Sequence, residues 1–85
     1  MIVVDIKDFT NGEILIEKDF QLKVEEHDWS SYTDKKVLVR GCSDIIIPPW
    51  AYMVIAGKLA GHADKIRFGN EHSNIVVYRK PKVTS

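Results

Sequence analysis

The residues with the most evident chemical potential in this sequence are a thiol, a hydroxyl and a carboxylate at consecutive positions, Cys42, Ser43 and Asp44. They follow the apolar run 37–39, and the turn after a central strand is where open α/β sheets often bind ligands. A cysteine thiolate is a nucleophile when its pKa is lowered. The sequence therefore offers these candidate residues for a ligand site or functional turn: Cys42, Ser43, Asp44, Trp50 and Tyr52.

A simpler interpretation of the same turn involves no chemistry. Cys42 lies well before the proline pair 48–49 that begins the next predicted helix, and a helix dipole acts mainly within its first turn. No histidine is close to Cys42 in the sequence. Free cysteines are usually buried and inert, so Cys42 would pack as a small apolar side chain while Ser43 and Asp44 shape the turn.

The histidines and glycines of the chain indicate neither a metal site nor a cofactor. His27, His62 and His72 match no compact ligand spacing, and a lone cysteine does not complete one. We interpret His27 as a residue at a helix end. The sequence contains no glycine-rich phosphate loop and no nucleophile elbow. Catalytic residues therefore stay unassigned, no metal or cofactor is expected, and an enzymatic role is not favoured.

Strands and helices alternate along the chain that carries these residues. Period-two alternation and short apolar runs predict strands near 2–7, 14–16, 37–39, 65–68 and 75–78. The first two would form a hairpin around Asn11-Gly12. Apolar residues at helical spacing predict helices at roughly 18–28 and 49–61. The order ββαβαββ predicts an α/β (α+β) fold, a two-layer sandwich whose mixed sheet has four or five strands and two helices.

The core of this sandwich is predicted from the central strand and the second helix. The segment 28–35 is polar apart from two aromatic residues and is predicted to be a loop. Runs of consecutive apolar residues suit a strand that is covered on both faces. The expected core residues are Val37, Leu38, Val39, Trp50, Met53, Val54, Ile55 and Leu59.

Length and composition indicate a single domain over residues 1–85, with a basic tail at 79–85. The net charge is +0, which gives no strong indication of nucleic-acid binding. The longest uncharged run, 45–57, is too short for a bilayer, so no membrane association is expected. A single cysteine and no secretory signal at the start lead us to expect a cytoplasmic protein.

The segment 41–53 is similar to a motif of an uncharacterised bacterial family of unknown function, Gly-Cys-Ser followed by Ile-Ile-Pro-x-Trp-Ala-Tyr-Met. Further matches fall at 5–8, 17–20, 27–30 and 68–69. The members that this chain resembles are longer and contain two diverged copies of one strand–helix–strand unit, of which this chain has one. The resemblance implies a fold and an oligomeric arrangement, and it supplies no catalytic residue.

These observations predict a non-catalytic interaction or regulatory module. The alternative is a small-molecule-binding protein or a thiol-dependent enzyme that uses the 42–44 turn. We also expect a homodimer, because the apolar runs 37–39 and 75–77 need cover on both faces of the sheet, whereas two helices cover one face. A second copy of the chain is the simplest cover, and it would reproduce the two-unit body of the longer relatives.

Overall fold

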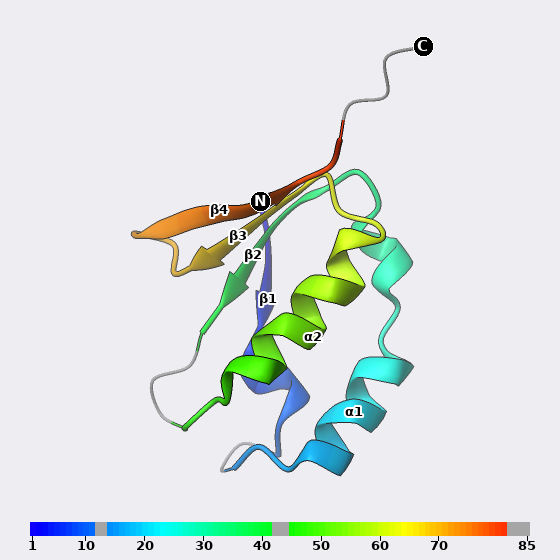
Figure 1. Cartoon of the computed structure of the whole chain (residues 1–85), viewed down its shortest axis with the longest axis vertical. Coiled ribbons are helices and arrows are strands. Elements are labelled where there is room, and N and C mark those ends of the chain that lie inside the picture. Colours follow the sequence, from blue (N-terminus) through cyan, green and yellow to red (C-terminus); the bar gives the residue numbers. More distant parts are fainter. Residues whose placement is uncertain (12–13, 42–44, 82–85) are drawn as a thin grey trace.

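The computed structural model describes residues 1–11, 14–41 and 45–81 of the chain. Two short 3₁₀ helices, η1 and η2, accompany the helices and strands (Figure 1). In chain order the elements are β1 (Ile2–Asp5), η1 (Ile6–Phe9), α1 (Glu17–Glu26), η2 (Trp29–Tyr32), β2 (Lys36–Arg40), α2 (Pro49–Ala60), β3 (Lys65–Gly69) and β4 (Asn74–Arg79).

The strands form one mixed sheet in the order β1-β2-β3-β4. The first three strands are parallel, and β4 is antiparallel to β3. Helix α2 lies across one face of the sheet, and α1 packs beside η1 beyond the end of β1 (Figure 1). The α/β fold with a mixed sheet and two helices, predicted from the sequence, is confirmed.

The predicted order ββαβαββ is confirmed except at its second strand. Residues 14–16 are in no strand, and Ile14 and Ile16 are exposed. The chain leaves β1 after Asp5, whose carboxylate accepts a hydrogen bond from the backbone N–H of Lys7 at 3.0 Å and so caps η1. Because β1 ends there, it cannot continue into a hairpin, and the predicted hairpin over 2–17 is wrong.

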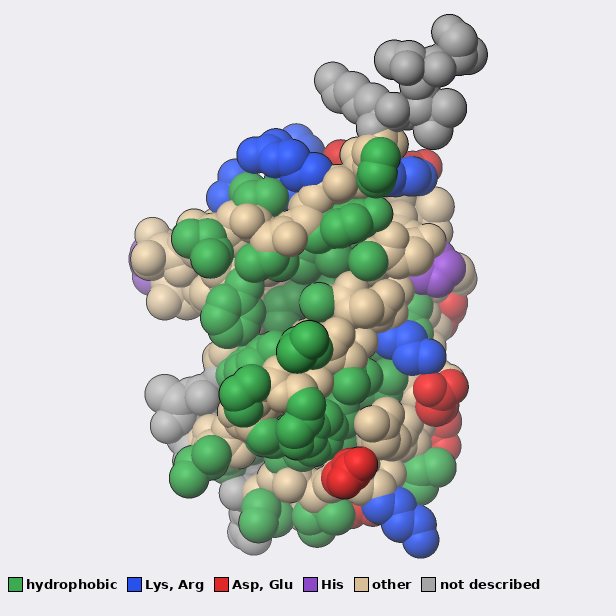
Figure 2. All heavy atoms as spheres, viewed as in Figure 1, with side chains coloured by type: hydrophobic (Ala, Val, Ile, Leu, Met, Phe, Trp, Pro, Cys, Tyr) green, Lys and Arg blue, Asp and Glu red, His purple; other side chains and the backbone are tan. Residues whose placement is uncertain are grey.

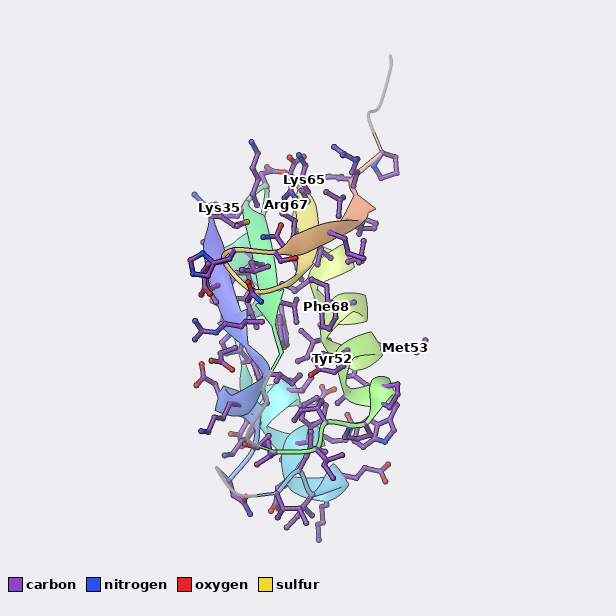
Figure 3. The ribbon with its side chains drawn as sticks, turned by 90° about the vertical axis from the view of Figure 1, so that its left-hand side faces the viewer. Lys35, Tyr52, Met53, Lys65, Arg67 and Phe68 are labelled. Carbon is purple, nitrogen blue, oxygen red and sulfur yellow. The ribbon has the colours of Figure 1, made fainter. Side chains whose placement is uncertain are left out.

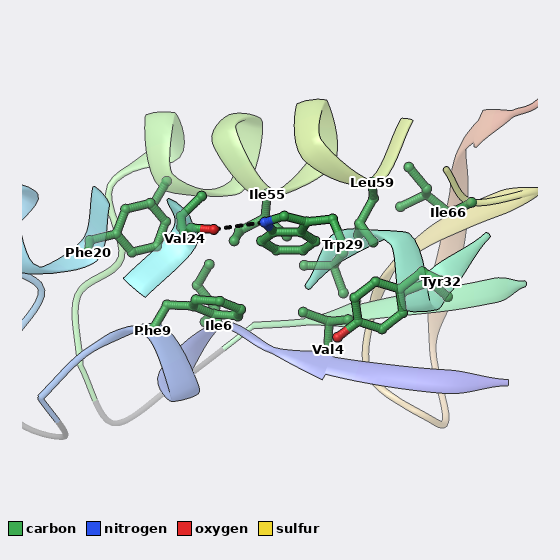
Figure 4. Close-up of a cluster of buried hydrophobic side chains, with 14 residues drawn as sticks. Val4, Ile6, Phe9, Phe20, Val24, Trp29, Tyr32, Ile55, Leu59 and Ile66 are labelled. Atoms are coloured by element: carbon green, nitrogen blue, oxygen red, sulfur yellow. Dashed lines mark hydrogen bonds between the residues drawn. The ribbon is translucent and has the colours of Figure 1, made fainter. Parts of the chain in front are cut away.

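The core lies between the sheet and the helices (Figure 4). Of the predicted core residues, Val37, Leu38, Val39, Ile55 and Leu59 are buried, and Trp50 and Val54 are partly buried against the core. Met53 is 74% exposed, so its predicted burial is wrong. The buried face of α2 carries Ala51, Ile55 and Leu59, and Met53 is rotated by about 200° from Ala51 around the helix axis.

The two 3₁₀ helices supply core residues that the sequence pattern did not indicate. Trp29 and Tyr32 lie in the segment predicted as a loop, and both are buried. The Trp29 indole N–H donates a hydrogen bond to the backbone carbonyl of Val24 at 2.8 Å, and its ring stacks on Phe9 with centroids 5.6 Å apart (Figure 4). Aromatic side chains on η1 and η2 thus fill the space between α1 and the sheet.

Candidate functional site

An apolar groove of about 290 Å³ lies between the first turns of α2 and the strands β2 to β4. No charged side chain is among the residues that line it. Tyr52 from α2 and Phe68 from β3 face each other in it (Figure 3). Met53 on α2 contributes to its outer rim. The complete lining is Val39, Pro49, Tyr52, Met53, Ala56, Ile66, Phe68 and Val77.

The groove exists because α2 covers the middle of the sheet and leaves the β4 edge bare. The helix packs against β2 and β3. Ile75 and Val77 on β4 are therefore 65% and 49% exposed. Hydrophobic side chains accordingly gather on the surface around α2 (Figure 2). The groove also lies beside the carboxyl ends of the parallel strands β2 and β3, where α/β sheets often bind their ligands.

Tyr52 is the candidate residue that the structure places in the groove. Its ring packs edge-on against Phe68, with centroids 4.9 Å apart. A Cβ atom at Gly41 would lie 3.1 Å from the Tyr52 hydroxyl. Gly41, the last described residue before the sequence-predicted functional turn, therefore lies close to the Tyr52 hydroxyl.

The other candidate residues are not brought together with Tyr52. The Trp50 ring packs edge-on against Phe20, with centroids 5.5 Å apart, and is not among the groove-lining residues. Trp50 therefore links α2 to α1. Cys42, Ser43 and Asp44 lie outside the described residues. Met53 was predicted to be a core residue but lines the groove instead. Its apolar type gave no indication that it would be exposed.

A second, smaller cavity of about 150 Å³ lies next to β1 and is lined in part by Asp8, Lys23, His27 and Tyr32. A hydrogen bond of 2.6 Å joins His27 Nε2 and the Tyr32 hydroxyl. Burial raises the pKa of Tyr32, and the nearby charges of Asp8 and Asp28 raise it further. The hydroxyl therefore stays protonated at neutral pH, which does not suit a phenolate nucleophile.

His27 in this cavity has a structural role. It is the C-terminal cap residue of α1, as the sequence indicated. Its ring packs against Phe9 and Trp29 with centroids 5.2 and 4.7 Å apart. Within residues 1–11, 14–41 and 45–81, no three His, Cys, Asp or Glu side chains gather as metal ligands. In the same residues, no helix is long and apolar enough to cross a membrane.

An ion-pair network holds the outer face of the sheet, the face turned away from α2. Arg40 on β2 donates from Nε and Nη2 to Asp5 Oδ2 at 3.1 and 2.6 Å, and from Nη1 to Glu71 at 2.6 Å. Burial acts to raise the pKa of Asp5, but the hydrogen bonds from Arg40 and Lys7 outweigh it and leave the pKa lowered. The network therefore ties β1, β2 and the β3–β4 turn together.

Arg40→Gln should lower stability in a pH-dependent way. Because the pKa of Asp5 is lowered in the folded state, its contribution is present above the ordinary value of 3.8 and is lost as the pH falls through the folded value. We expect the melting temperature to fall by about 2–4 °C at neutral pH. The loss should shrink at about pH 2.5, which thermal denaturation followed by circular dichroism would measure.

Lys18→Gln is the matched control, since it removes one exposed positive charge from α1. Its effect on the melting temperature should be small at both pH values. An Arg40→Gln penalty that is the same at neutral and acidic pH would contradict the assigned role of Asp5.

Comparison with known proteins gives a family for the chain. No curated protein and no solved structure matches it. Residues 1–82 match the sequence model of a family described as Protein of unknown function (DUF2480). The resemblance to an uncharacterised family that the sequence indicated is thereby confirmed. Because the match spans nearly all of the 85 residues, the chain belongs to the DUF2480 family.

Proposed function

We propose that this protein is a non-catalytic interaction module that forms a homodimer through the apolar groove and the β4 edge. The observation that carries this proposal is the continuity of the groove with an open strand edge. Met53 and Val77 line the groove and are also exposed, and Ile75 extends the apolar surface along β4. Exposed apolar patches of this kind mark interaction surfaces.

The chemistry of the groove favours protein contact over catalysis. Sites for small molecules combine apolar walls with a few placed polar groups that orient the ligand. Here Tyr52 supplies the hydroxyl, and every other lining side chain is apolar. The alternative thiol-dependent function involves Cys42, which lies outside the described residues, and no described contact favours it.

A second copy of the chain is the occupant that best fits the strand edge. β4 pairs with β3 on one side, and the other side is an edge of the described sheet. Ile75, Val76 and Val77 are β-branched, and no proline or charged residue interrupts β4 before Arg79. Edge strands that stay monomeric are usually interrupted by such residues.

Antiparallel pairing of β4 with β4 of a second copy would pair the free backbone groups of both strand edges. The two copies would then be related by a two-fold axis. It would also bring Ile75, Val77 and Met53 of both copies to one apolar interface. The homodimer expected from the sequence stays a prediction, and the position of the groove supports this surface for it.

Sedimentation at micromolar concentration tests the dimer. We expect the wild-type protein to have twice the chain mass of 9.7 kDa. Val77→Lys should convert the protein to the monomer, raising the dimer dissociation constant by at least about 100-fold, because two buried lysines would face each other at the interface. Val77 is half-exposed in the single chain, so the variant should remain folded.

Leu22→Lys is the matched control, since Leu22 is equally exposed but lies on α1, away from the groove. The control should sediment as the dimer. A wild-type monomer at about 100 μM would contradict the dimer, because stable interfaces hold far below that concentration. Dimeric Val77→Lys would contradict the assigned surface.

A further inference from the structure

A row of positive charges crosses the outer face of the sheet. Lys36 on β2 is the register partner of Lys65 on β3, and Lys65 is the register partner of Arg79 on β4. Their neighbours Val37, Ile66 and Tyr78 pack into or against the core, so the three cations point to the opposite face. Neighbouring strands are about 4.8 Å apart, so the row is about 10 Å long. We call Lys36, Lys65 and Arg79 the cationic row.

Two further cations extend the cationic row. Arg67 lies two residues after Lys65 on the same strand and therefore on the same face, and it donates a hydrogen bond to Asn74 at 3.0 Å. Lys35 directly precedes β2. Figure 3 shows Lys35, Lys65 and Arg67 at the same end of the sheet.

No carboxylate among the described residues forms an ion pair with the cationic row. The described ion pairs of the chain involve Arg40, Lys58 and Lys80 instead. The charge of Arg79 lowers the pKa of Lys65, followed by partial burial and the charges of Lys36 and Arg67, against the weaker opposing effect of Asp64. Lys65 thus experiences a net positive environment.

Like charges opposite each other in a sheet are destabilising. Uncharged polar residues would be soluble at these positions without that cost, so a row of three cations indicates an anionic partner. The net charge of the chain is zero because acidic residues elsewhere balance these cations. Those of α1, such as Glu17 and Asp19, lie at the other end of the molecule. Lys and Arg side chains gather at the end of the sheet away from α1 (Figure 2).

We propose that the cationic row binds the phosphate backbone of a nucleic acid without sequence preference. A linear array on the outer face of the sheet matches an extended chain of phosphates, whereas a compact anion would need an enclosing pocket. None of the outward positions of the four strands carries an aromatic side chain on which a base could stack. Contacts to phosphate alone carry no sequence information.

This inference is independent of the proposed homodimer. Pairing through β4 would leave the outer face uncovered, and a monomer presents the same cationic row. Sedimentation therefore tests the homodimer alone, and the nucleic-acid binding experiment tests the cationic row alone.

Fluorescence anisotropy with labelled 20-nucleotide single-stranded and duplex DNA tests the proposal. We expect binding with a dissociation constant on the order of 10–100 μM in about 25 mM NaCl, with little difference between unrelated sequences. If the complex neutralises about four phosphates, raising NaCl from about 25 to about 100 mM should weaken binding about 50- to 150-fold. No binding at the lower salt concentration would overturn the proposal.

Lys36→Gln/Arg79→Gln removes two cations of the row and should weaken binding at least about 10-fold, with the logarithmic salt slope reduced by about 2. Lys18→Gln/Lys58→Gln removes two cations from the helices and should change binding less than about 2-fold. An equal loss in both variants would overturn the assignment of the site.

Two further readouts distinguish phosphate binding at the cationic row from unfolding and from a general attraction to negative charge. The row variant should melt no lower than the wild type because it relieves repulsion, so weaker binding cannot come from unfolding. A poly-glutamate peptide of matched charge should bind more weakly than DNA. Equal binding of the peptide would overturn the assignment to a nucleic acid.

Discussion

Trp29→Ala should lower the free energy of unfolding by about 3–5 kcal/mol. The indole is buried, and its ring packs against Phe9, His27 and Tyr32. Alanine would leave a cavity between α1 and the sheet and would remove the hydrogen bond to the Val24 carbonyl. A domain of this size has a total stability of about 4–13 kcal/mol. The variant should therefore be largely unfolded at moderate urea concentrations where the wild type is folded.

Trp29→Phe separates the two parts of this effect. It retains an aromatic ring but leaves the Val24 carbonyl without its indole donor, so we expect an intermediate loss of about 1–3 kcal/mol. Leu22→Ala on the exposed side of α1 is the control and should change stability by less than about 0.5 kcal/mol. Urea denaturation followed by far-UV circular dichroism measures all three variants. A loss below about 1 kcal/mol in Trp29→Ala would contradict the central packing role of η2.

Gly69→Ala should be the second most damaging substitution, with an expected loss of about 2–4 kcal/mol. Gly69 has φ +140°, a conformation that residues with a side chain rarely adopt. An added Cβ atom would overlap the carbonyl oxygen of Ser73 and lie 2.8 Å from Cα of Asn74. Both neighbours are backbone atoms, so no side-chain rotation relieves the clash.

The damage should spread from the turn to β4, because this turn sets the strand beside β3. The turn is closed by the Asn70 side chain, which accepts hydrogen bonds from the backbone N–H groups of His72 and Ser73, both at 2.8 Å. Displacement of β4 would disturb the wall of the groove that Val77 provides. We therefore expect Gly69→Ala to weaken the proposed dimer as well, which sedimentation would report.

Gly57→Ala is the matched control for the same chemical change. Gly57 lies within α2, and an added Cβ atom would meet nothing within 4 Å. Alanine should stabilise the helix by about 0.5–1 kcal/mol, because glycine loses more backbone entropy on folding. Thermal denaturation should move in opposite directions for the two variants. A fall of the melting temperature in Gly57→Ala, or no fall in Gly69→Ala, would contradict the conformational roles assigned to these glycines.

Elements with a strong local pattern could be predicted from the sequence. The second helix was expected at 49–61 and lies at Pro49–Ala60, where Pro49 favours a helix start. The apolar run 37–39 is the buried centre of β2, and the alternating segment at 65–68 is β3. The prediction was possible because the period of apolar residues is a property of neighbouring positions. The same kind of pattern gave a wrong prediction of a strand at 14–16, where no strand forms and two of the three apolar residues are exposed.

The groove and the cationic row, on which the two proposals rest, are formed by the tertiary structure and could not be predicted from the sequence. Met53 is as apolar as Ile55, and the packing of α2 on β2 and β3 determined that one is exposed in the groove and the other is buried. Lys36, Lys65 and Arg79 are far apart in the sequence, and the strand register placed them in one row. The physical reason is that periodicity is local, whereas register and coverage depend on how distant segments pack around one core.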